Sequence, residues 1–90
     1  MTGYENMHPR RKKLRLRSWR RGMKEMDLIM GTFADENIAD LTEAELDEFE
    51  ALGNEPDQQV YAWITGAEQV PKKYDTALFA RIRSTRPRRK

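Results

Sequence analysis

The residues of this 90-residue sequence that are best suited to bind another molecule lie together in one short charged segment. It reads Arg20-Arg21-Gly22-Met23-Lys24-Glu25-Met26-Asp27 and marks the point where a basic N-terminal region turns acidic. Arginine and carboxylate side chains make strong, charge-assisted hydrogen bonds. Glycine allows backbone conformations, and close approach by another surface, that residues with a Cβ resist. The segment is therefore a candidate binding site.

Residues for catalysis or metal binding are scarce by comparison. The sequence has no cysteine, and its one histidine, His8, lies in a predicted tail, which argues against thiolate metal sites and a histidine-based triad. It has no phosphate-binding glycine loop, dinucleotide-binding turn or zinc-protease motif. Eight acids are predicted to lie on a solvated helix face and its approaches, because a small core can bury few charges. They are Asp35, Glu36, Asp40, Glu43, Glu45, Asp47, Glu48 and Glu50.

Charge is sorted into blocks along the chain, although the net charge is only +2. Nine basic residues and no acid lie between Arg10 and Lys24, whereas no Lys or Arg lies between Glu25 and Val70. Separate basic and acidic surfaces are therefore expected. The basic block can neutralise phosphates, so a small nucleic-acid-binding protein is an alternative function. The acidic remainder of the chain and the lack of a recognition helix argue against it.

Length and composition predict one small domain. Hydrophobic residues make up 38% and charged residues 36% of the chain, which is polar for a globular protein but too apolar for disorder. Its thin core leaves little room for an internal cofactor. We expect a flexible tail at residues 1–8, a domain at 9–86 and a basic tail at 87–90. No apolar run reaches the roughly 18–20 residues of a membrane span, and residues 1–9 do not resemble a secretory signal. A cytoplasmic bacterial protein is expected.

Hydrophobic periodicity predicts an all-α bundle of five short helices. The first helix runs from Pro9 or Arg10 to Arg20, with Leu16 and Trp19 on its buried face, and Gly22 ends it. The second buries a stripe at spacings of three and four. This stripe consists of Met23, Met26, Met30 and Phe33, with Ile29 beside it. The sequence gives no reason for Gly31, which costs about 1 kcal/mol relative to Ala inside a helix.

The third helix has the clearest start. Thr42 and Glu45 form a predicted capping box, and Leu41 and Leu46 a hydrophobic staple. The third helix is predicted to bury Leu46, Phe49 and Leu52, with Gly53 as its C-terminal cap. The fourth is predicted to have Pro56 at a first helical position, to carry Val60, Trp63, Ile64 and Ala67 at helical spacing, and to stop near Gly66. The last is predicted to bury Tyr74, Leu78 and Ile82.

Helical projection separates two roles within the charged segment. At about 100° per residue, Met23 and Met26 face the core, whereas Glu25 and Leu28 face away and Gly22 lies on the flank. Gly22, Glu25 and Leu28 thus form a candidate partner-binding patch. Two plainer interpretations remain open. The patch is ordinary surface, or Arg21 and Glu25 form only a weak intrahelical ion pair around a helix break.

The run Arg-Ser-Trp-Arg-Arg-Gly-Met-Lys-Glu-Met-Asp-Leu, residues 17–28, resembles the signature of the succinate dehydrogenase assembly factors, which contains Arg-Gly-x-x-Glu. Further markers follow in the same order as in that family. They are Phe33, the helix start Leu41-Thr42, Pro56-Asp57 and Trp63-Ile64-Thr65-Gly66. The resemblance covers roughly residues 10–83. Gly31 and Thr32 stand where bulkier residues are common, which leaves the packing of the second helix open.

The resemblance implies a monomeric five-helix factor that binds the flavoprotein subunit of succinate dehydrogenase, and in bacteria that of fumarate reductase, and promotes covalent FAD attachment. It implies partner-binding roles for Arg21, Gly22 and Glu25, with Arg20 and Asp27 as neighbours. The factor would be no enzyme and would hold no FAD stably, since the partner supplies the flavin site and the acceptor histidine. A eukaryotic member would act in the mitochondrial matrix. A small antitoxin-like regulator is a further alternative that no residue specifically supports.

Overall fold

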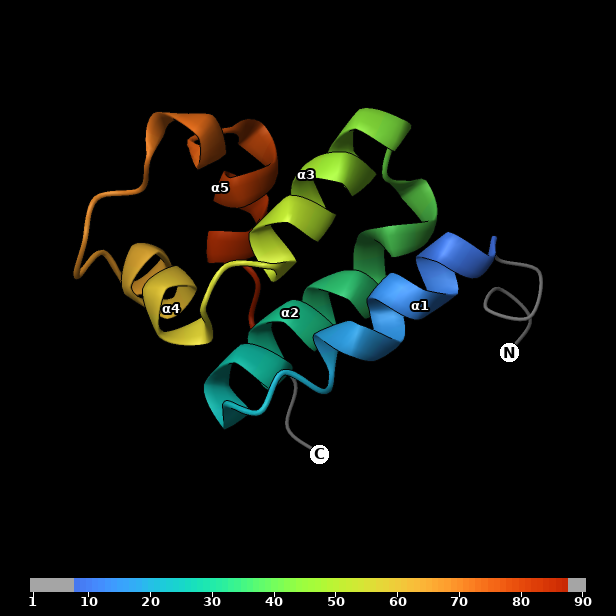
Figure 1. Cartoon of the computed structure of the whole chain (residues 1–90), viewed down its shortest axis with the longest axis horizontal. Helices are drawn as coiled ribbons and strands as arrows, with labels where there is room; N and C mark the ends of the chain where they lie inside the picture. Colours follow the sequence, from blue (N-terminus) through green and yellow to red (C-terminus); the bar gives the residue numbers. More distant parts are fainter. Residues whose placement is uncertain (1–7, 88–90) are drawn as a thin grey trace.

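The computed structural model describes residues 8–87, which contain five α-helices, two short 3-10 helices and no strand (Figure 1). The elements are α1 (Pro9–Ser18), α2 (Lys24–Asn37), η1 (Ile38–Asp40), α3 (Glu43–Gly53), α4 (Asp57–Thr65), η2 (Lys72–Tyr74) and α5 (Ala77–Arg83). The predicted all-α, five-helix architecture is confirmed. The predicted tails lie outside the described residues, apart from His8 and Pro87. His8 accepts a hydrogen bond on Nδ1 from the backbone N–H of Arg10 and so caps α1.

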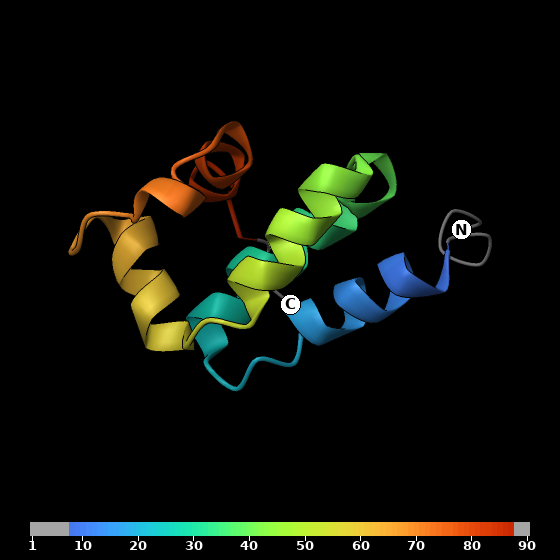
Figure 2. The same ribbon diagram turned by 45° about the horizontal axis from the view of Figure 1, so that its top comes forward.

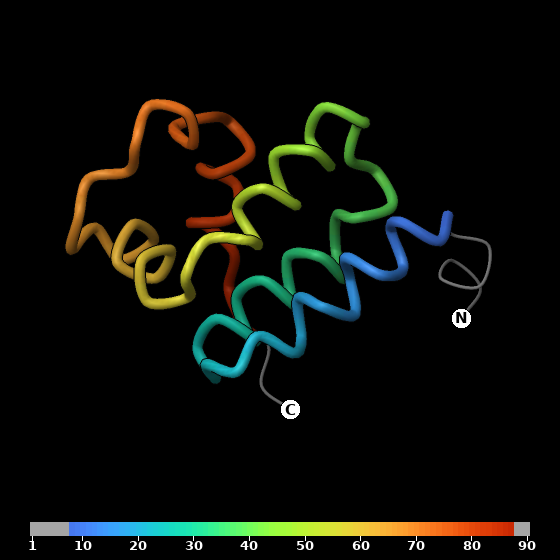
Figure 3. The backbone as a smooth tube through the Cα atoms, in the orientation of Figure 1, coloured from blue at the N-terminus to red at the C-terminus, as the bar shows by residue number. Residues whose placement is uncertain are grey.

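α1 and α2 run antiparallel side by side, and α3 lies against them (Figures 1 and 2). α4 and α5 form the other end of the molecule, where α5 returns toward α2 and α3 (Figure 3). The short connection between α1 and α2, residues 19–23, carries the first half of the charged segment, and the first turn of α2 carries the second half. The connection between α3 and α4 lies close to the α1–α2 connection in space. Arg21 hydrogen-bonds the Glu55 carbonyl in the α3–α4 connection and Asp57, the first residue of α4.

All five α-helices contribute to one core, most of which the periodicity predicts. The fully or almost fully buried side chains include Met26, Met30, Phe33, Leu46, Phe49, Leu52, Val60, Trp63, Leu78, Phe79 and Ile82. Phe33 and Phe49 pack with their ring centroids 5.7 Å apart, which joins α2 to α3. Met23 is only partly buried, because it precedes α2 as its N-cap residue. Tyr74 is buried from η2 rather than from the last α-helix.

The predicted start of α3 is confirmed in detail. The Thr42 hydroxyl accepts a bond from the Glu45 N–H at 3.1 Å, and the Glu45 carboxylate accepts one from the Thr42 N–H at 2.9 Å. Leu41 and Leu46, the predicted staple, are both buried. Gly66 ends α4 in a left-handed conformation, with φ at 85°, which favours glycine.

Other local predictions are wrong. Gly53 is the last residue of α3 and not a left-handed cap, while Pro56 precedes α4 as its N-cap. Ala67 is exposed, because α4 ends at Thr65.

The buried face of α1 also differs from the prediction. Leu16 is 48% exposed, and Leu14 and Ser18 are buried in its place. The inner face follows positions 11, 14, 15 and 18, where Arg11 and Arg15 make hydrogen bonds to η1 and α2. Polar contacts therefore determine which face of α1 is turned toward the core. The spacing of hydrophobic residues alone does not predict these contacts.

Gly31 acquires a reason in the folded chain. The indole of Trp19 lies against α2 at this position, and a Cβ on Gly31 would come within 3.0 Å of three ring carbons. The missing side chain thus lets Trp19 pack onto the α2 backbone. The doubt about the packing of α2 is resolved by a residue 12 positions earlier in the sequence.

Candidate partner-binding site

Gly22 lies at the tip of the α1–α2 connection with φ at 97°, a conformation that residues with a Cβ rarely adopt. It is exposed, and no atom lies within 4 Å of the position that a Cβ would occupy. Packing in the free protein therefore does not demand a glycine here. The backbone conformation does, and it leaves an open surface where another molecule can approach the main chain.

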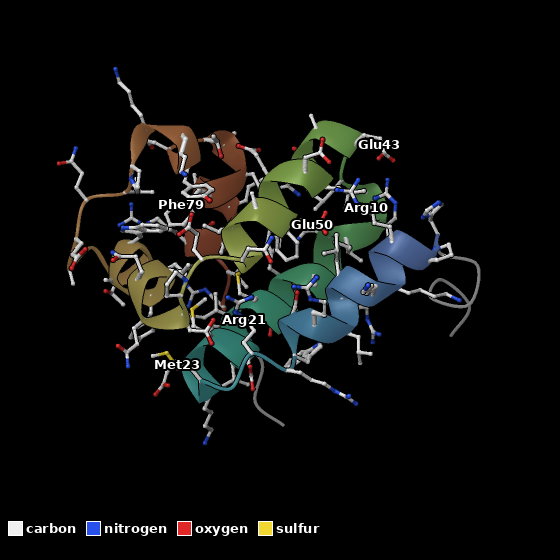
Figure 4. The ribbon with its side chains drawn as sticks, in the orientation of Figure 1. Arg10, Arg21, Met23, Glu43, Glu50 and Phe79 are labelled. Carbon is white, nitrogen blue, oxygen red and sulfur yellow. The ribbon has the colours of Figure 1, made fainter. Side chains whose placement is uncertain are left out.

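Arg21 points inward from the same connection (Figure 4). Its Nε donates to Oδ1 of Asp57 at 2.7 Å, and its Nη2 donates to the Glu55 carbonyl at 3.4 Å. The side chains of Arg21 and Asp57 are only 10% and 18% exposed. Arg21 thus ties the connection to the first residue of α4. The interpretation of Arg21 and Glu25 as an intrahelical pair is wrong, because Arg21 precedes α2 and pairs with Asp57.

Asp27 holds the connection from the other side. Its Oδ1 accepts a hydrogen bond from the backbone N–H of Arg21 at 2.6 Å. Asp27 also lies in the first turn of α2, where a carboxylate is favoured by the positive end of the helix dipole. One aspartate therefore fixes the main chain immediately before Gly22 and stabilises the start of α2.

The five predicted site residues thus divide into two sets. Arg20, Gly22 and Glu25 are exposed around the tip of the connection. Arg21 and Asp27 are partly buried and hold the tip in place. Leu28, which was expected to face outward with Glu25, is half-buried. The resemblance includes Pro56-Asp57 as a marker, but the chain order gave no signal that Arg21 pairs with Asp57 and Glu55, because they lie more than 30 residues away.

Asp35 is a second acid with a structural role. Its Oδ1 accepts hydrogen bonds from Arg15 Nε at 2.8 Å and from Trp19 Nε1 at 3.1 Å. Its side chain is 16% exposed, so its assignment to a solvated face is wrong. These bonds fix the indole over Gly31 and hold the end of α1 against α2.

The basic and acidic blocks also meet more closely than expected. Arg10 bonds three acids of α3, with Nη–carboxylate distances of 3.3 Å to Glu43, 2.7 Å to Asp47 and 2.8 Å to Glu50 (Figure 4). Hydrogen bonds to Asp47 and Glu50 raise the pKa of Arg10 above its ordinary value. The predicted separation into basic and acidic surfaces is therefore incomplete, because part of each block neutralises the other.

Tyr74 supports the α3–α4 connection from the opposite side. Its hydroxyl donates to Oε2 of Glu55 at 2.7 Å, and its ring packs on Trp63 with centroids 5.5 Å apart. Burial, together with the bond to Glu55, raises the pKa of Tyr74 to about 12. Glu55 therefore accepts a hydrogen bond from Tyr74 on its carboxylate and one from Arg21 on its backbone carbonyl.

Within residues 8–87, no group of three or more His, Asp or Glu side chains is arranged to hold a metal ion, and no helix is long and apolar enough to cross a membrane. The fold and the site define a small α-helical protein that presents an exposed glycine turn between charged side chains. Comparison with protein families agrees. Residues 12–86 match the family described as "Flavinator of succinate dehydrogenase", and the chain belongs to this family.

Individual relatives are named as assembly factors of succinate dehydrogenase. The chain is 42% identical over 66 residues to "Succinate dehydrogenase assembly factor 2, mitochondrial" of Dictyostelium discoideum, covering 73% of this chain and 47% of that protein. It is 41% identical over 71 residues to the protein of that name in Scheffersomyces stipitis, covering 79% and 44%. It is 36% identical over 76 residues to "Succinate dehydrogenase assembly factor 2-B, mitochondrial" of Drosophila mojavensis, covering 82% and 48%.

The chain thus spans about half the length of the curated relatives it matches. No solved structure matches it.

Proposed function

We propose that this protein binds the flavoprotein subunit of succinate dehydrogenase and promotes covalent attachment of FAD to it. The bacterial flavoprotein subunit of fumarate reductase is a second partner in this proposal. One observation gives the main support for the proposed binding site. Gly22 is held at φ 97° on an exposed tip, between a tethered arginine and a tethered aspartate. Membership of the family described as "Flavinator of succinate dehydrogenase" supports this choice of partner.

Each site residue has a distinct part in this proposal. Gly22 lets the backbone of the partner approach the connection, because nothing projects from it. Glu25 and Arg20, which are exposed, make charge-assisted hydrogen bonds to the partner. Arg21 and Asp27 act as positioning residues, since their bonds fix the connection before the partner arrives. A preformed tip reduces the entropy that must be lost on binding.

The proposed factor is not itself the enzyme of the attachment reaction and holds no FAD stably. The partner contributes both the flavin site and the acceptor histidine. By binding one conformation of a mobile flavoprotein more tightly than the others, the factor raises the population in which flavin and histidine meet. The factor acts as a monomer in this proposal, in whichever compartment holds the flavoprotein before assembly, the bacterial cytoplasm or the mitochondrial matrix.

The nucleic-acid alternative finds little support in the structure. Arg10, Arg11 and Arg15 are engaged with acids or a carbonyl of the same molecule. These contacts remove part of the basic block from a potential phosphate-binding surface. The antitoxin-like alternative gains no supporting feature.

The proposal is tested by in-gel fluorescence of covalent flavin in the flavoprotein subunit. A strain that lacks the endogenous factor is complemented with wild type, Gly22→Arg, Glu25→Ala or the control Glu36→Ala. Glu36 is an exposed acid on the same helix as Glu25 but far from the tip. We expect both tip variants to lower covalent flavin while the control restores it. Full flavinylation by folded Gly22→Arg and Glu25→Ala proteins would refute the proposed site.

A further inference from the structure

α1 has two faces with different uses. Its inner face bonds α2, α3 and η1 through arginines that already have partners. Its outer face is formed by positions three, four and seven residues apart, which share one side of a helix and its immediate extension. These positions are Lys13, Leu16, Arg17 and Arg20, and all four are exposed. Among the described residues, Leu16 is the one large hydrophobic residue that is exposed, at 48%.

This outer face opens into a cleft of about 420 Å³. The cleft is lined from α1 and the connection after it by Leu16, Arg17, Arg20 and Arg21, and from the opposite side by Gly53, Glu55 and Asp57. The volume is in the range that accommodates a few side chains of a binding partner. The cleft therefore combines an apolar contact with three arginines, next to the Gly22 tip.

Charge within the cleft is not balanced. Asp57 is neutralised by Arg21, and Glu55 already accepts the Tyr74 phenol and lies 3.9 Å from Lys73. Arg17 bonds the neutral amide of Asn54 at 3.3 Å. Among the described residues, no carboxylate lies within ion-pair distance of Arg17 or Arg20. The α1 side of the cleft is therefore left with positive charge around an exposed leucine.

We propose that the outer face of α1 and this cleft form a second docking surface, which receives an acidic segment of the flavoprotein subunit. This inference rests on the proposed function and extends it beyond the Gly22 tip. The segment carries an apolar side chain that covers Leu16 and carboxylates that pair with Arg17 and Lys13. Charge complementarity sets this choice. A nucleic-acid backbone fits less well, because it would place phosphates beside Glu55 and leave Leu16 in contact with a polyanion.

The inference is tested by titrating the purified flavoprotein subunit, without covalent FAD, with the whole chain in a calorimeter. Leu16→Asp places a repelling charge at the apolar contact, and Arg17→Glu reverses the charge beside it. We expect each variant to weaken binding by about tenfold or more, equal to about 1.4 kcal/mol. Leu16→Met should bind as wild type does. Lys72→Glu, an equal charge reversal at an exposed residue of η2, should change binding by less than about twofold.

Each outcome decides the matter. If Leu16→Asp and Arg17→Glu bind as wild type while Glu25→Ala does not, the α1 face is only solvated surface, and the inference is overturned while the proposed function stands. If wild type does not bind the flavoprotein, both fall. Displacement of the flavoprotein by a polythymidine oligonucleotide, lost in Arg17→Glu, would assign the face to nucleic acid and overturn the inference. Circular dichroism of each variant checks that it is folded. Substitutions of Leu16 should leave the fold intact, because its side chain is exposed.

Discussion

The guanidinium of Arg21 and the carboxylate of Asp57 lie 36 residues apart in the sequence and bond to each other with an Nε–Oδ1 distance of 2.7 Å. The pair joins the α1–α2 connection to the start of α4, and both side chains are largely buried. The side chain of this arginine, which belongs to the Arg-Gly-x-x-Glu signature, thus stabilises the fold. Its effect on a partner is indirect, through the position of Gly22.

Breaking this pair should destabilise the protein and weaken its function together. Removing one member leaves a partly buried charge without its partner, and Arg21→Ala or Asp57→Ala should each lower the free energy of unfolding by about 2 kcal/mol. A double-mutant cycle by urea denaturation should give a coupling energy of about 1 kcal/mol or more. We also expect Asp57→Ala to lower covalent flavin in the partner, although Asp57 lies outside the signature. Additive effects of the two substitutions would contradict the pairing.

Gly31→Ala should be destabilising even though alanine is the better helix former. The added Cβ would press into the indole of Trp19, and overpacking of this kind typically costs about 1–3 kcal/mol. The expected result is a lower midpoint of thermal unfolding. Gly53→Ala is the matched control, because its Cβ would meet only Arg21 Nη1, at 3.4 Å. It should be neutral or slightly stabilising. Equal midpoints for the Gly31 variant and wild type would exclude a close Trp19 contact.

Gly22 offers a way to separate backbone conformation from close approach by a partner. L-alanine is strained at φ 97°, so Gly22→Ala should lower stability by about 1–2 kcal/mol. D-alanine, introduced by chemical ligation, adopts positive φ without this strain and should leave stability near that of wild type. We expect both variants to reduce flavinylation, because both add a methyl group at the tip. Normal flavinylation with D-alanine would show that only the conformation matters.

Tyr74→Phe should change how stability depends on high pH. The pKa of Tyr74 is raised from about 10 when unfolded to about 12 when folded. The neutral phenol therefore contributes stability that is fully present below pH 10 and is lost as pH rises toward 12. Urea unfolding across this window should show a steeper loss for wild type than for Tyr74→Phe. At neutral pH the variant should lose about 1 kcal/mol, through the missing bond to Glu55. Parallel pH profiles would contradict a buried phenol.

The helices and most of the core could be predicted from the sequence, because they depend on neighbouring residues. The spacing of Met26, Met30 and Phe33 specifies the buried side of α2, and Thr42 with Glu45 specifies the start of α3. The face of α1 was predicted wrongly. Its inner side is selected by hydrogen bonds from Arg11 and Arg15 to other elements, and a periodicity of apolar residues carries no record of such bonds.

By itself, the sequence determined the all-α class, the break at Gly22 and the segment on which the site is built, since these follow from local propensity and from a motif in chain order. Only the tertiary structure decided which site residues face outward and which hold the site. Arg21 meets Asp57, and Trp19 meets Gly31, because helices distant along the chain pack together. Such pairings depend on how the helices are rotated and placed against one another, which no single stretch of the sequence specifies.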